Sequence, residues 1–97
     1  MAKSVYRAGI DEIDAQIVEL LERRMAICEQ IGIEKAQSGE EVLDAKREWE
    51  KINSIKELTH HVPYREYMER IYIEIMAQSR YLQTSIASQI ENGQDEM

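Results

Sequence analysis

Apolar residues recur through the first third of the chain at intervals of three and four. The repeating positions are Ile10, Ile13, Ile17, Leu20, Leu21, Cys28 and Ile31. This spacing places them on one face of an α-helix, which is the pattern of a helix with one buried side. The pattern predicts a helix from about Ser4 to Ser38, with Gly39 as its C-terminal cap.

Two more helices follow from the same kind of pattern. The second is predicted to open at Asp44, a good N-cap residue, and to carry Trp49, Ile52 and Ile55 inward. The third is predicted to begin near Pro63, and its apolar positions are Tyr67, Met68, Ile71, Ile75, Leu82, Ile86 and Ile90. The expected fold is therefore all-α, with one helical domain over residues 1–90. Residues 91–97 form an acidic tail that we expect to be disordered.

The length of the first helix makes a prediction about assembly. Its 35 residues would span roughly 52 Å, at about 1.5 Å per residue. A compact chain of this size should measure only about 32 Å across. Because the helix stays apolar on one face to its end, something must cover the part that overhangs. We expect an intertwined homodimer, with a single long coiled coil as the alternative.

Charged and polar residues interrupt the apolar faces of all three predicted helices. They are Arg24 and Lys35 on the first, Glu48 beside Arg47 on the second, and Ser79 and Gln83 on the third. Each alone could be a satisfied core group, and an ion pair between Arg24 and Glu48 would explain two of them. Together they would be costly, because an unsatisfied buried polar group costs about 1–3 kcal/mol. The set therefore predicts the wall of a polar pocket.

Composition and charge narrow the possible partners. Charged residues make up 32% of the chain, hydrophobic residues 43%, and the net charge is −7. Such an acidic chain is a poor partner for nucleic acid or an anionic membrane. No apolar run reaches the 18 or so residues of a membrane span, and residues 1–10 lack the apolar core of a signal peptide. We expect a cytoplasmic protein in which Cys28 is a core residue in a reducing compartment.

The pocket residues indicate a kind of chemistry. Two or more cations favour a ligand with several negative charges, and arginine suits carboxylates in particular. Arg24 and Lys35 are about 16 Å apart along the helix, so they could hold opposite ends of a small molecule. The sequence offers no convincing nucleophile or metal cluster, and His60 and His61 are expected to be solvated. Catalysis by positioning and electrostatics, as in a rearrangement without a cofactor, fits this inventory.

The order and spacing of these residues resemble those of the all-helical chorismate mutases. The resemblance covers roughly residues 5–86 and includes eight family site positions. These are Arg7, Arg24, Lys35, Asp44, Arg47, Glu48, Ser79 and Gln83. The resemblance implies a dimer of three-helix chains that converts the dicarboxylate chorismate to prephenate without a cofactor. In that family the reaction belongs to the shikimate pathway, in the biosynthesis of phenylalanine and tyrosine.

The resemblance also implies a role for each position. Arg24, Arg47 and Lys35 would hold the carboxylates. Lys35 and Gln83 would donate to the ether oxygen, where negative charge builds as the C–O bond breaks, and Glu48 would accept from the ring hydroxyl. The implied catalytic group is Lys35, Gln83, Arg24 and Glu48. Supporting substrate contacts would come from backbone near Asp44 and from Ser79.

Arg7 is implied to enter the site from the neighbouring chain. Geometry favours the same arrangement, because Arg7 and Arg24 are separated by about 25 Å along a straight helix. Two residues so far apart cannot hold one small substrate from the same helix. On its own, however, Arg7 would be read as an ordinary solvated residue near the start of a helix.

Three other functions remain open from the sequence. An isochorismate-pyruvate lyase on the same fold needs similar cations, but the pair Arg47 and Glu48 behind Asp44 favours the mutase. A mutase acting on an amino-substituted chorismate (aminodeoxychorismate) is poorly separated by sequence. A non-catalytic helical dimerisation module, in which the inward charges form ion pairs, is the alternative from another class.

Overall fold

The chain folds into three α-helices joined by two short connections. The computed structural model describes residues 2–95, and no β-strand occurs among them. Helix α1 spans Ala2–Ser38, α2 spans Ala45–Leu58 and α3 spans Arg65–Asp95, with a 3₁₀ turn, η1, at Val62–Tyr64. The all-α prediction, with one very long N-terminal helix, is confirmed.

Helix α1 ends where the sequence predicts, at a glycine in the left-handed region. Gly39 has φ 75°, which a residue with a side chain adopts only at a cost. The next amide, that of Glu40, donates to the carbonyl oxygen of Lys35 at 3.0 Å. This bond satisfies a carbonyl that would otherwise lack a partner at the helix end. Gly39 is therefore the C-terminal cap of α1.

Local signals also fix the start of α2 and the approach to α3. The carboxylate of Asp44 accepts a hydrogen bond from the backbone amide of Arg47 at 3.1 Å, which confirms the predicted N-cap. Pro63 lies in η1, so the α-helical hydrogen bonding of α3 starts two residues later, at Arg65. At its other end, α3 continues to Asp95, so the boundary predicted at Ile90 is too early. The predicted disorder of Glu96 and Met97 lies outside the described residues.

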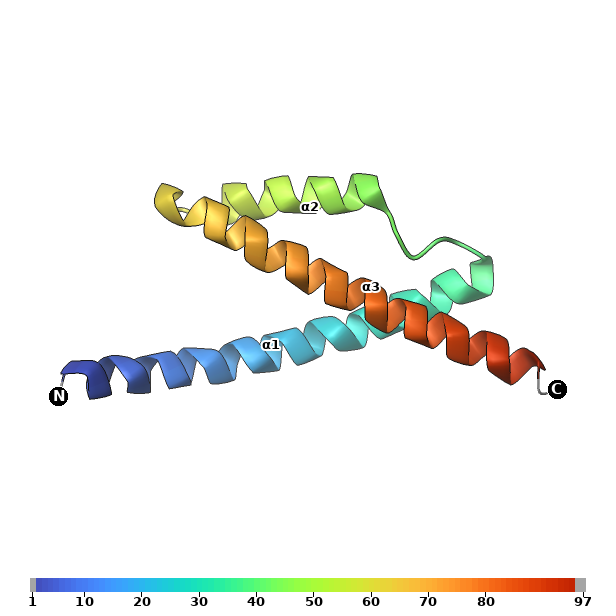
Figure 1. Ribbon diagram of the computed structural model, residues 1–97, viewed down its shortest axis with the longest axis horizontal. Helices are drawn as coiled ribbons and strands as arrows, with labels where there is room; N and C mark the ends of the chain where they lie inside the picture. The colour runs from blue at the N-terminus through green and yellow to red at the C-terminus, as the bar shows by residue number, and fades with distance from the viewer. Residues whose placement is uncertain (1, 96–97) are drawn as a thin grey trace.

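Helix α3 is the element that contacts both of the others. It runs diagonally from the end of α2 across α1, with α2 on one side and α1 on the other (Figure 1). The buried hydrophobic residues lie along these two contacts and are Cys28, Ile55, Met76 and Ala77. The hydrophobic core of the chain is thus small, and a cavity lies where the three helices approach one another.

Trp49 does not contribute to this core. The sequence predicts it to point inward with Ile52 and Ile55, but its side chain is 69% exposed. Ile55 is buried and Ile52 is half-buried, so the inner face of α2 is the one that also carries Glu48. Residue 49 is rotated about 100° from residue 48 around the helix axis, which turns Trp49 away from α3.

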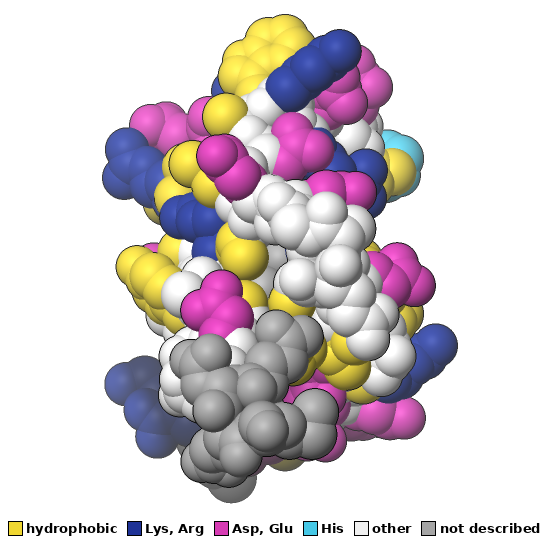
Figure 2. All heavy atoms as spheres, turned by 90° about the vertical axis from the view of Figure 1, so that its right-hand side faces the viewer, with side chains coloured by type: hydrophobic (Ala, Val, Ile, Leu, Met, Phe, Trp, Pro, Cys, Tyr) yellow, Lys and Arg dark blue, Asp and Glu magenta, His cyan; other side chains and the backbone are white. Residues whose placement is uncertain are grey.

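The protomer is elongated and leaves much apolar surface uncovered. Its extents are 61 × 28 × 14 Å and its radius of gyration is 17.4 Å, against about 12.5 Å for a compact chain of this length. In the N-terminal half of α1, Ile10 and Ile13 are each 55% exposed and Ile17 is 45% exposed. Hydrophobic side chains also reach the surface among charged ones when the molecule is viewed from its other end (Figure 2). The rest of the chain therefore leaves this apolar face of α1 largely uncovered.

A helix that crosses a lipid bilayer must be both long enough and apolar enough. Within residues 2–95, no helix combines the length and the apolar character needed to span a membrane.

The closest approach of α1 to α3 depends on a glycine. Gly32 is buried, and a Cβ at this position would lie 3.1 Å from Cγ of Gln83 and 3.3 Å from its Cα. These distances are shorter than ordinary carbon–carbon contacts of about 3.5–4.0 Å. The missing side chain therefore lets the backbone of α3 come close to that of α1 at the position of Gln83.

We predict that Gly32→Ala lowers the free energy of unfolding relative to Gly9→Ala by about 1–3 kcal/mol, the usual cost of overpacking. Both substitutions gain about 1 kcal/mol of helix propensity. Only Gly32 has neighbours in the way, since nothing lies within 4 Å of a Cβ built on Gly9. Urea denaturation of the two variants measures the difference, and equal stabilities would contradict a tight crossing at Gly32.

Candidate active site

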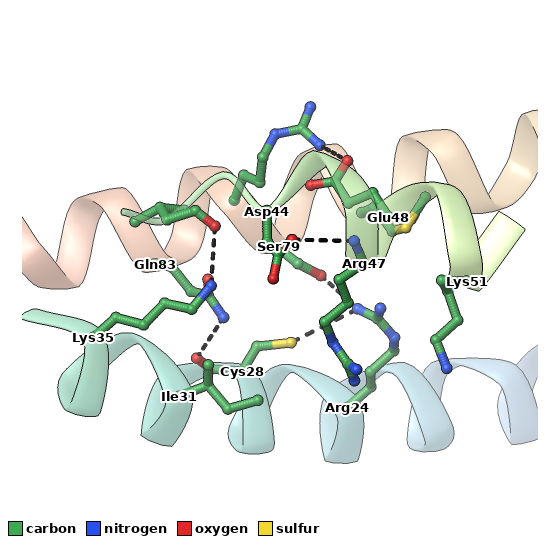
Figure 3. A pocket seen from close by; sticks show the side chains of 13 residues that line it. Arg24, Cys28, Ile31, Lys35, Asp44, Arg47, Glu48, Lys51, Ser79 and Gln83 are labelled. Carbon is green, nitrogen blue, oxygen red and sulfur yellow. Dashed lines mark hydrogen bonds and ion pairs between the residues drawn. The ribbon is translucent and has the colours of Figure 1, made fainter. Parts of the chain in front are cut away.

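A cavity opens between the three helices beside this crossing. The empty space within it is about 610 Å³, including the part open to solvent. Side chains from α1, α2 and α3 line it together with the loop between α1 and α2 (Figure 3). Seven of the eight residues singled out from the sequence meet there: Arg24, Lys35, Asp44, Arg47, Glu48, Ser79 and Gln83.

Arg7 is the eighth residue, and the structure does not bring it to the cavity. It lies exposed near the start of α1, 17 residues before Arg24 on the same helix. A continuous helix separates the two by about 25 Å. Within one protomer, therefore, Arg7 cannot reach a small molecule held by Arg24.

Arg24 connects α1 to α3 across the floor of the cavity. Its Nη1 donates to the hydroxyl oxygen of Ser79 at 2.5 Å and lies 3.7 Å from the sulfur of Cys28. Ser79 in turn donates to the carbonyl oxygen of Ile75 at 2.9 Å. The sequence also allowed an ion pair between Arg24 and Glu48, and that pair does not form. The charge of Arg24 thus has a hydroxyl and a thiol as its neighbours, with no carboxylate bonded to it.

Lys35 ties the end of α1 to the loop that leads into α2. Its Nζ donates to the carbonyl oxygen of Val42 at 3.1 Å, and the side chain is half-buried. The next helix starts at the end of this loop, where Asp44 caps the amide of Arg47. The ammonium group has three N–H donors, so two remain after the bond to Val42. Because Lys35 lines the cavity, these donors can serve a ligand there.

Gln83 is the most buried polar residue of the site. Its side chain is 7% exposed, and Nε2 donates to the backbone carbonyl of Cys28 at 3.1 Å. This bond fixes which end of the amide is the NH₂ group and leaves one N–H on the same nitrogen. Gly32 makes the geometry possible, because a side chain there would push Gln83 away from α1.

Glu48 has a partner that the sequence reasoning missed. Its Oε1 accepts from Nη1 of Arg80 at 2.5 Å, and the two side chains are 26% and 31% exposed. Arg80 also lines the cavity, as does Lys51. Spacing could have identified Arg80, since it follows Met76 by four positions and precedes Gln83 by three, on the inward side of α3.

The cavity is electropositive although the chain is acidic. Its lining includes five cationic side chains, namely Arg24, Lys35, Arg47, Lys51 and Arg80, and two acidic ones, Asp44 and Glu48. The excess of three positive charges contrasts with a net charge of −7 for the whole chain. A concave site with this imbalance attracts a ligand that carries more than one negative charge.

Groups for covalent or metal chemistry lie elsewhere or are buried. Cys28 is 8% exposed and has the character of a core residue, as predicted. His60 and His61 are exposed in the connection before α3, and the ring of His61 lies 4.3 Å from that of Tyr64, centroid to centroid, at a tilt of 55°. Among residues 2–95 no group of three or more side chains is arranged to hold a metal ion. What the cavity offers is cations and hydrogen-bond donors at fixed positions.

Comparison with known proteins agrees with this geometry. The sequence profile of the family described as chorismate mutase type II matches residues 6–84, which is most of the chain and spans all seven cavity residues. No individual curated protein and no solved structure matches the chain. The match agrees with the all-helical fold, its long N-terminal helix and the electropositive cavity between the three helices. The chain therefore belongs to the chorismate mutase type II family.

Proposed function

We propose that the protein is a chorismate mutase, which converts chorismate to prephenate in the biosynthesis of phenylalanine and tyrosine. The observation that carries the proposal is the convergence of Arg24, Arg47 and Lys35 with the buried amide of Gln83 in one cavity. Chorismate carries two carboxylates and an enolpyruvyl ether, so its charges and its reacting oxygen match this set of donors. The proposed place of action is the cytoplasm, as the sequence suggested.

Positioning is the first contribution to the proposed reaction. The rearrangement forms a C–C bond between the enolpyruvyl group and the ring while the ether C–O bond breaks, within one molecule. Holding the enolpyruvyl group over the ring removes conformational freedom before the reaction, and good alignment contributes several kcal/mol to many reactions. Arg24 and Arg47, which come from different helices, are suited to hold the two carboxylates in that folded conformation.

Electrostatic stabilisation is the second contribution. As the C–O bond breaks, negative charge builds on the ether oxygen, and donors aimed at that oxygen stabilise the transition state more than the substrate. Lys35 keeps two free N–H groups after its bond to Val42, and Gln83 keeps one after its bond to Cys28. These are the donors that we assign to the ether oxygen.

Glu48 supplies the carboxylate of the proposed catalytic group. Arg80 occupies Oε1 of its carboxylate, and Oε2 has capacity for the ring hydroxyl of chorismate. We assign the backbone near Asp44 to the ring hydroxyl. Ser79 would assist a carboxylate by holding Arg24, since its own proton is donated to the carbonyl oxygen of Ile75. These assignments follow the family positions and are consistent with the cavity lining.

We further infer that the active form is an intertwined homodimer in which Arg7 of each chain completes the site of the other. The exposed apolar face of α1 supports this inference. A second, almost wholly apolar groove between α1 and α3 supports it too, lined in part by Leu21, Met25 and Ile71. Burying such a surface against a second copy would be favourable. A second copy would also bring an Arg7 that the first copy cannot supply to its own cavity.

Three alternatives are separated by different observations. A lyase that releases pyruvate from isochorismate has less use for a carboxylate at Glu48. A helical module without catalysis would balance its inward charges, whereas the cavity has an excess of three cations. A mutase for the amino-substituted substrate would have to accept an ammonium group among the cations of this lining.

We predict that the purified protein converts chorismate to prephenate at an enzymatic rate. Loss of the diene absorbance of chorismate follows the reaction, and chromatography identifies the product. Pyruvate release from isochorismate, with chorismate left unchanged, would indicate the lyase. Inactivity towards both substrates would favour the helical module.

We predict that Gln83→Ala loses nearly all turnover while it retains its helical circular dichroism spectrum, because a donor to the ether oxygen is removed. Gln89→Ala is the control, since Gln89 is exposed on the same helix.

Wild-type activity should be flat from pH 6 to 8, because an amide does not titrate. Gln83→Glu should gain activity as the pH falls, since glutamate ordinarily titrates at about pH 4.3 and donates only when protonated. An active Gln83→Ala protein would remove this residue from the mechanism.

We predict that inactive Arg7→Ala and Lys35→Ala chains restore activity to each other when they are mixed. If each site takes Arg7 from one chain and Lys35 from the other, a hybrid dimer has one site with both residues intact. Random exchange places half of the chains in hybrids, so about a quarter of the sites would be intact. Activity at that level is the expected result, and no recovery despite proven subunit exchange would mean that each site is built from one chain.

A further inference from the structure

The ion pair between Arg80 and Glu48 lies inside the cavity rather than on the outer surface. It joins α3 to α2 across 32 positions of sequence, with side chains that are 31% and 26% exposed. The pair formed by Arg70 and Glu66 on the same helix is 73% exposed on both sides and connects neighbouring turns. Surface pairs of that kind are screened by water, whereas a partly buried pair keeps more of its electrostatic effect on a nearby ligand.

The cation beside Glu48 changes what this carboxylate can bind. A lone carboxylate in a cavity would attract an ammonium group strongly as a counterion. Here the guanidinium of Arg80 already compensates the charge of Glu48, and Lys51 adds a further positive charge to the same lining. The second oxygen of Glu48 therefore remains a good hydrogen-bond acceptor for a neutral hydroxyl. An ammonium group at the same place would meet a positive charge.

We propose that Arg80 is a specificity-determining residue that makes this site select the hydroxyl form of the substrate over the amino-substituted form. The proposal rests on the proposed mutase function and deepens it by naming the substituent that the site accepts. Arg80 acts through Glu48 and through its own charge, without taking part in the bond rearrangement. The amino-substituted chorismate carries an ammonium group near neutral pH, as aliphatic amines do.

The test compares kcat/KM for chorismate and for amino-substituted chorismate at pH 7, in the wild-type protein and three variants. The wild-type protein should prefer chorismate. Arg80→Gln keeps a hydrogen-bond donor but removes the charge, and it should raise the amino-to-hydroxyl ratio of kcat/KM by about tenfold or more, equivalent to 1.4 kcal/mol. Arg80→Lys should keep the wild-type ratio within about threefold. The control Arg70→Gln, at the exposed pair on the same helix, should leave it unchanged.

Each outcome has a distinct meaning. An Arg80→Gln protein that loses activity equally towards both substrates would overturn the selectivity proposal, since it would leave Arg80 only a role in positioning Glu48. A ratio changed as much by Arg80→Lys as by Arg80→Gln would overturn it too. The wild-type protein tests the proposal even if a variant fails to fold. A kcat/KM for the amino substrate equal to or higher than that for chorismate would contradict the proposal. Inactivity of the wild-type protein on both substrates would overturn the proposed function itself.

Discussion

The close approach of α1 and α3 at Gly32 is the constraint on which the site depends. A Cβ at Gly32 would lie 3.1–3.3 Å from atoms of Gln83, so the absence of a side chain sets the separation of the two helices. At that separation the amide of Gln83 reaches the carbonyl of Cys28. Moving α3 outward by the width of a methyl group would break this bond and also lengthen the bond between Arg24 and Ser79. The helix crossing and the donor geometry are therefore one feature.

The elongated shape of the protomer follows from the same arrangement. Three helices that meet around a polar cavity bury few hydrophobic residues, and the apolar side chains of α1 beyond the crossing remain exposed. A small chain with so little core gains stability by covering this surface with another chain. In the proposed homodimer the long helix would serve two purposes, because the surface that joins two chains would also carry Arg7 towards the site of the other chain.

Local chemistry made much of the fold predictable from the sequence. Asp44 and Gly39 act on the backbone next to them, and so the end of α1 and the start of α2 could be read directly. The grouping of seven polar residues in one cavity was also predictable, because each interrupts an apolar stripe or adjoins such an interruption. The exposure of Trp49 was not predictable in this way, nor was the pairing of Arg80 with Glu48, although spacing places Arg80 on the inward side of α3. Both depend on how α2 is rotated against α3, which no local signal specifies.

The polar contacts within the cavity bear on how the proposed enzyme would favour a transition state. Each proposed donor is already held by a second group: Arg24 by Ser79, Lys35 by the carbonyl of Val42, and Gln83 by that of Cys28. A donor fixed before the ligand arrives loses little conformational entropy on binding and needs little reorientation as charge develops. The ligand can then occupy the N–H groups that remain. In the proposed mutase, cations and donors held in this way would accelerate the rearrangement, since the fold has already oriented them.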